Sequence, residues 1–324
     1  MKEPLYYQAI KHSWKLAWEH KMLWLFGLFA AFLGQVGIWD LLSKVGLAAA
    51  GRPVHANFFA WLGFLKELAL GATTMDLTAD GWVWFFCLML ILLGFVIMLT
   101  FVSVVSQGAI IKASALSAKN KKLPDVDTAW HVGVKHFWRL LFINVVKKIL
   151  FCILAIFVSW VTVKMLLGAG VGGAMLFLLV FILSSLIGLV ITFLSFYAAA
   201  YVVVEEFKFG EALSSAWKLF IGHWLVSIEV GIIMIFMTII LGLVVLFGMM
   251  ILFLPTLFSW LIAGWSYNYA LAYAGLLVGT GLSAIFIIFA GSLFTIFNTS
   301  VWTYLFMKMH KVGIKSRIMH YLGK

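Results

Sequence analysis

Long apolar runs alternate along the chain with short stretches in which apolar and polar residues recur at helical spacing. A helix needs roughly 20 apolar residues to cross about 30 Å of hydrocarbon. Runs close to or above this length predict six transmembrane helices, at 22–42, 82–110, 149–167, 175–203, 224–254 and 276–307. Only helices satisfy all their backbone polar groups within one segment in lipid, and the runs lack the alternation of barrel strands. We therefore expect an all-α membrane protein.

The composition supports the same class. Hydrophobic residues make up 65% of the chain and charged residues 11%, and the mean hydropathy is +1.11. Such a chain has too little polar surface to cover a water-soluble globule of this size.

A short pattern occurs three times, with offsets of 120 and 83 residues between the copies, and each copy precedes a predicted span. It ends in an aromatic residue or valine followed by lysine, at Trp14 and Lys15, Val134 and Lys135, and Trp217 and Lys218. We interpret the chain as a single membrane domain, 1–324, built from three repeat units. The units cover approximately 1–118, 119–205 and 206–310, and a basic cytoplasmic tail follows at 308–324.

Each copy predicts an amphipathic helix that lies in the cytoplasmic membrane interface ahead of a transmembrane hairpin. Apolar and aromatic residues recur three and four positions apart on one face, with lysines on the other, as interfacial helices require. Small residues four positions apart would let a neighbouring helix approach closely; they are Ala9 and Ser13, Ala129 and Gly133, and Ala212 and Ala216. Each stretch could instead be the end of a long membrane helix, but Pro4, Pro124 and Gly210 favour separate helices.

The basic residues predict the orientation. If both termini are cytoplasmic, all but four of the 23 basic residues lie on the inner side, the four outside being Lys44, Arg52, Lys66 and Lys164. This bias follows the positive-inside rule and predicts a multi-pass membrane protein with both termini in the cytoplasm. The longest outer segment, 43–81, has an apolar stripe that is typical of a second, outward-facing surface helix.

The pI near 9.6 does not require a nucleic-acid partner, because the positive-inside rule already accounts for the positive charge. Membrane lipids are the expected partners, and anionic headgroups on the cytoplasmic side would contribute about 1 kcal/mol per basic residue near the surface. The sequence does not identify protein partners.

Glu229 is the only acidic residue well inside a predicted span. The repeat offset aligns Glu229 with Val146, so Lys147 and Lys148 should lie at nearly the same depth in the second unit. Because charges inside a membrane are costly unless they are paired or face water, we expect an ion pair from Glu229 to Lys147 or Lys148 that ties the two units together. The alternatives are an ion or proton site and side chains that snorkel to the interface.

No constellation of catalytic or metal-binding residues appears in the sequence. The eight histidines include no pair four residues apart on a helix, and the acidic residues form no compact cluster, so no metal site is expected. The sequence has no nucleophile elbow, phosphate-binding loop or zinc-protease motif, and we expect no cofactor and no catalytic residue.

Two stretches carry a family resemblance. They are the run 201–205 with Glu211, Ala212, Leu213, Ser214 and 217–224, and the group Gly108, Ala109, Ile110 and Ala113. The pattern resembles the membrane domain that accompanies bacterial glycerophosphoryl diester phosphodiesterases and also occurs in stand-alone relatives. The resemblance implies a six-helix inner-membrane protein, and it carries over no catalytic residue because the printed sequence contains no phosphodiesterase domain.

Three hypotheses for function follow. The lack of site chemistry favours a non-enzymatic structural or accessory component of the membrane that interacts with lipid or with partner proteins. The alternative is a transporter or channel for a lipid-like or amphipathic molecule, which the internal repetition and the Glu229 region would suit. An enzyme acting on lipid phosphodiesters is the least favoured, because the acids and histidines such chemistry needs are lacking.

Overall fold

The structure is a computed structural model of the chain, and it describes residues 5–32, 79–167, 171–267 and 269–312. Within these ranges the secondary structure is helical. The helices are α1 Leu5–Glu19, α2 Met22–Phe32, α5 Ala79–Ala118, α6 Val126–Lys135, α7 Phe137–Leu167, α8 Val171–Val204, α9 Phe209–Gly222, α10 Trp224–Ser266 and α11 Tyr269–Val312.

Five of these helices, α5, α7, α8, α10 and α11, are long and apolar enough to cross a membrane. The expectation of an all-helical fold is therefore confirmed for the described part of the chain, and its five long apolar helices make a multi-pass membrane protein plausible. The first predicted span, 22–42, begins as the short apolar helix α2 and continues into residues outside the described ranges. Nearly all of the outer segment 43–81 also lies outside those ranges. The sixth span therefore stays a prediction.

The long helices extend beyond the predicted spans. Helix α7 begins at Phe137, twelve residues before the predicted start, and α10 continues through Pro255 to Ser266. A proline is tolerated in a membrane helix where neighbouring groups compensate for the missing hydrogen bond. Close to Pro255, the Thr256 hydroxyl donates to the Gly275 carbonyl on α11 at 2.9 Å, which joins the two helices near the tip of their hairpin.

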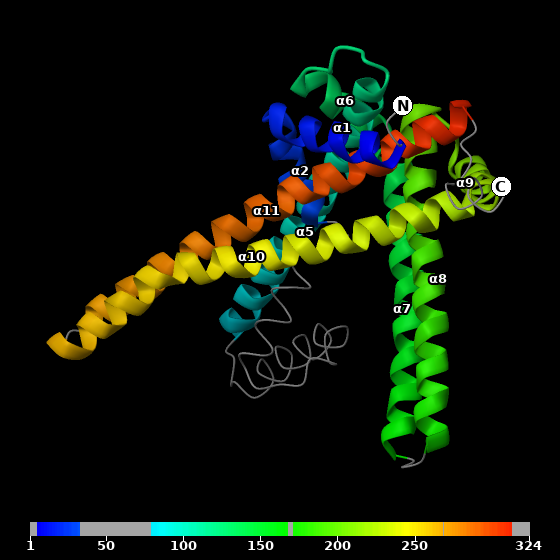
Figure 1. The fold of residues 1–324 in the computed structure, drawn as a ribbon. Coiled ribbons are helices and arrows are strands. Elements are labelled where there is room, and N and C mark those ends of the chain that lie inside the picture. Colours follow the sequence, from blue (N-terminus) through cyan, green and yellow to red (C-terminus); the bar gives the residue numbers. More distant parts are fainter. Residues whose placement is uncertain (1–4, 33–78, 168–170, 268, 313–324) are drawn as a thin grey trace.

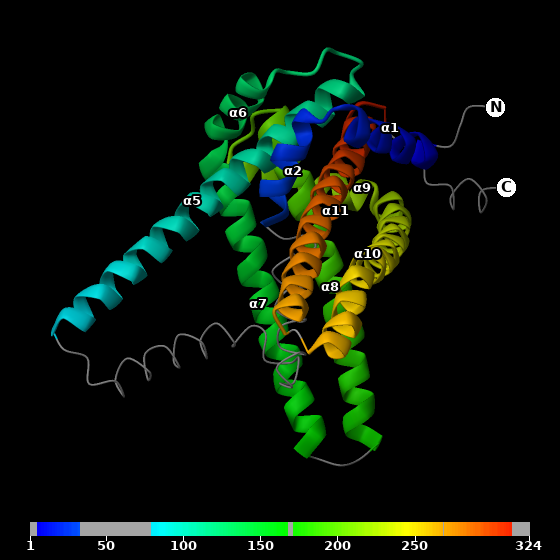
Figure 2. The same ribbon diagram turned by 90° about the vertical axis from the view of Figure 1, so that its left-hand side faces the viewer.

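The long helices form arms that diverge from one end of the molecule (Figures 1 and 2). One arm is the α7–α8 hairpin and another is the α10–α11 hairpin, while α5 forms a third, with α2 packed between α5 and α11. The three short helices α1, α6 and α9 lie where the arms converge.

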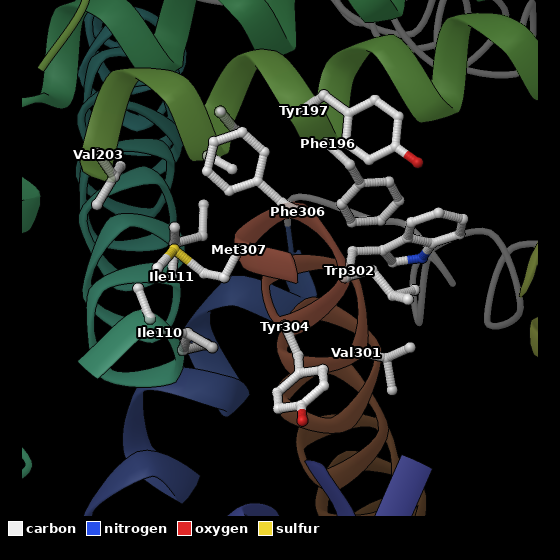
Figure 3. Close-up of a cluster of buried hydrophobic side chains, with 14 of the residues drawn as sticks. Ile110, Ile111, Phe196, Tyr197, Val203, Val301, Trp302, Tyr304, Phe306 and Met307 are labelled. Atoms are coloured by element: carbon white, nitrogen blue, oxygen red, sulfur yellow. The ribbon is translucent and has the colours of Figure 1, made fainter. Parts of the chain in front are cut away.

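The hydrophobic core lies at this convergent end. The Trp302 ring of α11 stacks on Phe196 of α8 with centroids 5.2 Å apart, and Phe306 meets the Tyr201 ring edge-on at 4.8 Å. Figure 3 shows Trp302 and Phe306 of α11 beside Phe196 of α8. Towards the far ends of the arms, large apolar side chains are exposed, among them Ile91, Met175 and Leu277. A helix that is apolar on every side is suited to lipid, so the exposed arms have the surface expected of membrane-embedded helices.

Candidate functional site

Each of the short helices α1, α6 and α9 packs on one of the long helices. Helix α6 packs on α5, α9 on α8, and α1 on α11. The small residues predicted to allow this approach are all buried, namely Ala9, Ser13, Ala129, Gly133, Ala212 and Ala216. At Gly133 the approach is close, because an added Cβ would lie 2.2 Å from the carbonyl oxygen of Val105 on α5.

A cavity of about 500 Å³ lies between helix α9 and the α7–α8 hairpin. We call it the α9 cavity. Its described lining consists mainly of apolar side chains with two serines, a glycine and one lysine: Ile143, Val146, Lys147, Leu150, Ile191, Leu194, Ser195, Phe209, Gly210, Leu213, Ser214 and Trp217. This volume falls within the range of about 300–1,000 Å³ that is typical of small-molecule sites.

The linker between α8 and α9 is bound by basic side chains of α6 and α7, which position the start of α9. The Lys135 ammonium group donates to the Glu206 carboxylate at 2.8 Å. Arg139 donates to the Glu206 carbonyl at 3.1 Å and to the Phe207 carbonyl at 3.4 Å. Hydrogen bonding to the Lys135 ammonium, followed by its charge, lowers the pKa of the Glu206 carboxyl group. These contacts seat the first turn of α9 over the cavity.

Lys147 is the basic residue of the cavity lining. It is half-buried, and its Nζ lies 5.8 Å from the centre of the Phe196 ring, within the distance of a cation–π interaction. The next residue, Lys148, is exposed.

Glu229 lies on α10, where its half-buried carboxylate accepts a hydrogen bond from the Tyr6 hydroxyl of α1. The predicted ion pair from Glu229 to Lys147 or Lys148 stays a prediction. The contact with Tyr6 was not foreseen from the sequence, because the two residues lie 223 positions apart and on different helices.

A second cavity, of about 270 Å³, lies beneath α6. Its lining includes Val126, Asp127 and Trp130, which the offset of 83 residues aligns with Phe209, Gly210 and Leu213 of the α9 cavity. The remaining lining comes from α2 and α5, at Leu25, Phe26, Phe29 and Ser106. The two cavities thus use matching positions of the short helices, but the described lining of the second contains an aspartate and no lysine.

The six residues at the end of the repeated pattern lie on the outer faces of the short helices. Trp14, Val134 and Trp217 are exposed, and Trp217 also lines the α9 cavity. Lys15 pairs with Glu19 at 3.6 Å, Lys135 holds Glu206 as described, and Lys218 is exposed.

A histidine lies at the junction between α6 and α7. His136 is only 2% exposed, and its Nδ1 donates to the Val132 carbonyl at 2.8 Å. Burial lowers the pKa of its imidazole below the ordinary value of 6.5. The folded protein therefore favours the neutral ring.

Among the described residues, no group of three or more histidine, cysteine, aspartate or glutamate side chains is placed to hold a metal ion. The chain matches no family model, and neither a curated protein nor a solved structure shows significant similarity to it.

Proposed function

We propose that this protein is a non-enzymatic component of a bacterial inner membrane, with its three short helices in the cytoplasmic interface and both termini in the cytoplasm. In this role it would organise lipid, or hold partner proteins, at the inner leaflet. The observation that carries the proposal is that charge collects at one end of the diverging helices.

All but one of the basic residues of the described helices and linkers lie on the short helices, on the linkers next to them or on the parts of the long helices beside them. They are Lys11, Lys15, Lys21, Lys112, Lys119, Lys121, Lys122, Lys135, Arg139, Lys147, Lys148, Lys208, Lys218, Lys308 and Lys311. At the opposite tips, the charged residues of the described helices are Asp80 and Lys164. An excess of lysine and arginine marks the cytoplasmic side of a membrane protein, and anionic headgroups attract it.

We also propose that the chain consists of three repeat units, each an interfacial helix followed by a transmembrane hairpin. The packing of α6, α9 and α1 on three different long helices, α5, α8 and α11, supports this arrangement, as do the matched lining positions of the two cavities. In a six-span protein, the residues after α2 would complete the first hairpin. A relationship to the membrane domain associated with phosphodiesterases remains a proposal that the sequence pattern alone supports.

A transporter of a lipid-like molecule is the second candidate. The observation in its favour is the α9 cavity, which lies beside two helices able to span a membrane. A transporter would move such a molecule across the bilayer, so reconstituted vesicles would show faster exchange of a labelled lipid between leaflets. A rate equal to that of protein-free vesicles would leave the accessory role.

The orientation is tested by labelling single cysteines in intact bacterial cells. Cys87 and Cys152 are first replaced by alanine, and Lys218→Cys on α9 is compared with Lys164→Cys at the far tip of α7. A membrane-impermeant maleimide should label Lys164→Cys in spheroplasts and Lys218→Cys only after the membrane is permeabilised. Labelling of Lys218→Cys from outside would overturn the proposed orientation.

A further inference from the structure

We propose that the α9 cavity binds one anionic phospholipid, with the Lys147 ammonium group on the headgroup phosphate and the acyl chains along the apolar lining. The proposal rests on the membrane placement given above, and it adds a ligand class and a binding residue to that placement.

The walls of the cavity come from two kinds of helix. Helices α7 and α8 are apolar and long enough to cross the membrane, whereas α9 is one of the three short helices at the basic end. A molecule lying between them therefore spans the boundary between headgroups and hydrocarbon. A phospholipid has its charged and apolar parts in this order, whereas a soluble anion or a polar peptide does not.

The charge of the lining selects an anion. Lys147 is the only charged residue among the described lining residues, and no carboxylate accompanies it there. The neighbouring Lys148 is exposed and adds positive potential. A partly buried ammonium group surrounded by apolar side chains is costly unless an anion or hydrogen-bond acceptor meets it. Lysine is a common phosphate ligand, because its ammonium group has three donors that adapt to the phosphate oxygens.

The remaining lining suits acyl chains. Leu150 lies almost one helical turn beyond Lys147 on α7, and Ile191 and Leu194 face the same cavity from α8. The Ser195 hydroxyl is already used, since it donates to the Ile191 carbonyl at 2.7 Å. A free phosphate would leave this apolar lining empty, so we assign the site to a lipid.

The cavity beneath α6 provides a comparison within the same chain. It uses matching positions of its short helix, but it is smaller and its described charged residue is Asp127. An anionic headgroup would be repelled there. The selectivity for anionic lipid should therefore depend on the α9 cavity.

The test uses the full-length protein, purified in a neutral detergent, with phosphatidylglycerol and phosphatidylcholine of identical acyl chains as probes. Lipid binding is measured by native mass spectrometry and by the rise in apparent melting temperature. Phosphatidylglycerol should bind more tightly than phosphatidylcholine, and Lys147→Met should weaken its binding by tenfold or more, because a charge-assisted hydrogen bond is lost. The matched control Lys148→Met removes a charge of the same sign one residue away, on an exposed side chain, and should have a much smaller effect.

Two further variants keep the result interpretable if Lys147→Met is poorly folded. Lys147→Arg retains the charge and should retain phosphatidylglycerol binding. Gly210→Leu adds a side chain at a lining position where a Cβ meets no atom within 4 Å, and should weaken binding of phosphatidylglycerol while leaving Lys147 intact.

Three outcomes would overturn the proposal: equal binding of the two lipids, unchanged phosphatidylglycerol binding in both Lys147→Met and Gly210→Leu, or equal stabilisation by inorganic phosphate. The last would identify a site for free anions. Cysteine labelling reports the orientation independently. Labelling of Lys218→Cys from outside, together with Lys147-dependent binding, would refute the proposed orientation and retain the lipid site. Protection of Lys218→Cys in intact cells, together with binding that does not depend on Lys147, would remove only the lipid site.

Discussion

The substitution Gly133→Ala tests whether close contact between α6 and α5 holds the short helix in place. Gly133 is buried on α6. A Cβ built on Gly108 of α5 would lie 3.0 Å from the Cα of Gly133. A Cβ on Gly133 itself would meet the Val105 carbonyl oxygen at 2.2 Å and the Val105 Cγ1 at 2.8 Å. The nearest atom belongs to the backbone, so a side-chain rotation cannot relieve the clash.

The expected loss follows from two opposing effects. Excess volume in a packed core typically costs about 1–3 kcal/mol, and a backbone neighbour in a buried helix places this site at the upper end. Alanine gains about 1 kcal/mol over glycine inside a helix. The net loss should therefore be about 2 kcal/mol, which is roughly a 30-fold change in the ratio of folded to unfolded protein.

The assay is thermal unfolding of the purified protein in detergent, followed by tryptophan fluorescence. Since 1 kcal/mol shifts the melting temperature of a domain of 150–250 residues by about 2–4 °C, Gly133→Ala should lower it by several degrees. The matched control is Gly94→Ala on α5, where an added Cβ meets no atom within 4 Å, and it should leave the melting temperature equal or slightly higher. If Gly133→Ala is as stable as the wild type, the close packing of α6 on α5 is refuted.

Three further predictions follow from buried or half-buried polar groups. Burial lowers the pKa of His136 below 6.5, so below that pH the unfolded chain binds more protons than the folded protein. The stability of the wild type should therefore fall as the pH drops below 6.5. In His136→Gln, the melting temperature should depend less on pH between pH 5 and 7 than in the wild type. Tyr197→Phe removes a buried hydroxyl whose oxygen lies 2.7 Å from that of Ser227. It should cost about 0.5–1.5 kcal/mol in thermal unfolding, and an unchanged melting temperature in Ser227→Ala and Tyr197→Phe alike would show that the bond contributes nothing. Tyr6→Phe and Glu229→Met remove the donor and the acceptor of the contact between α1 and α10. A double-mutant cycle should therefore give non-additive losses, whereas additive losses would show that the two residues act independently.

The structure agrees most closely with the predictions that rest on the local pattern of residues. Apolar length identified the helices able to cross a membrane, and a proline or glycine near the start of each repeated stretch predicted that α1, α6 and α9 would be separate helices, as the structure has them. The small residues of the pattern, such as Gly133, are buried as expected. These properties depend on residues within a few turns of one another, which is why sequence reasoning reaches them.

The ends of the long helices were harder to predict. Hydropathy marks where a helix is apolar, while backbone hydrogen bonds continue beyond that boundary. Helix α7 therefore starts at Phe137 and carries Arg139 and Lys147 as part of one continuous helix. This continuity places the Lys147 side chain beside α9, whereas the sequence had assigned it to a segment before the span.

The sequence by itself determined that this chain is helical, apolar enough for a membrane, and basic at one end of its helices, because composition and spacing fix these properties locally. Only the tertiary structure decided which hairpin each short helix covers, and with it the α9 cavity and the contact between Tyr6 and Glu229. The two residues of that contact are 223 positions apart. A contact of this kind depends on the packing of several helices at once, which the spacing of residues along one helix does not specify.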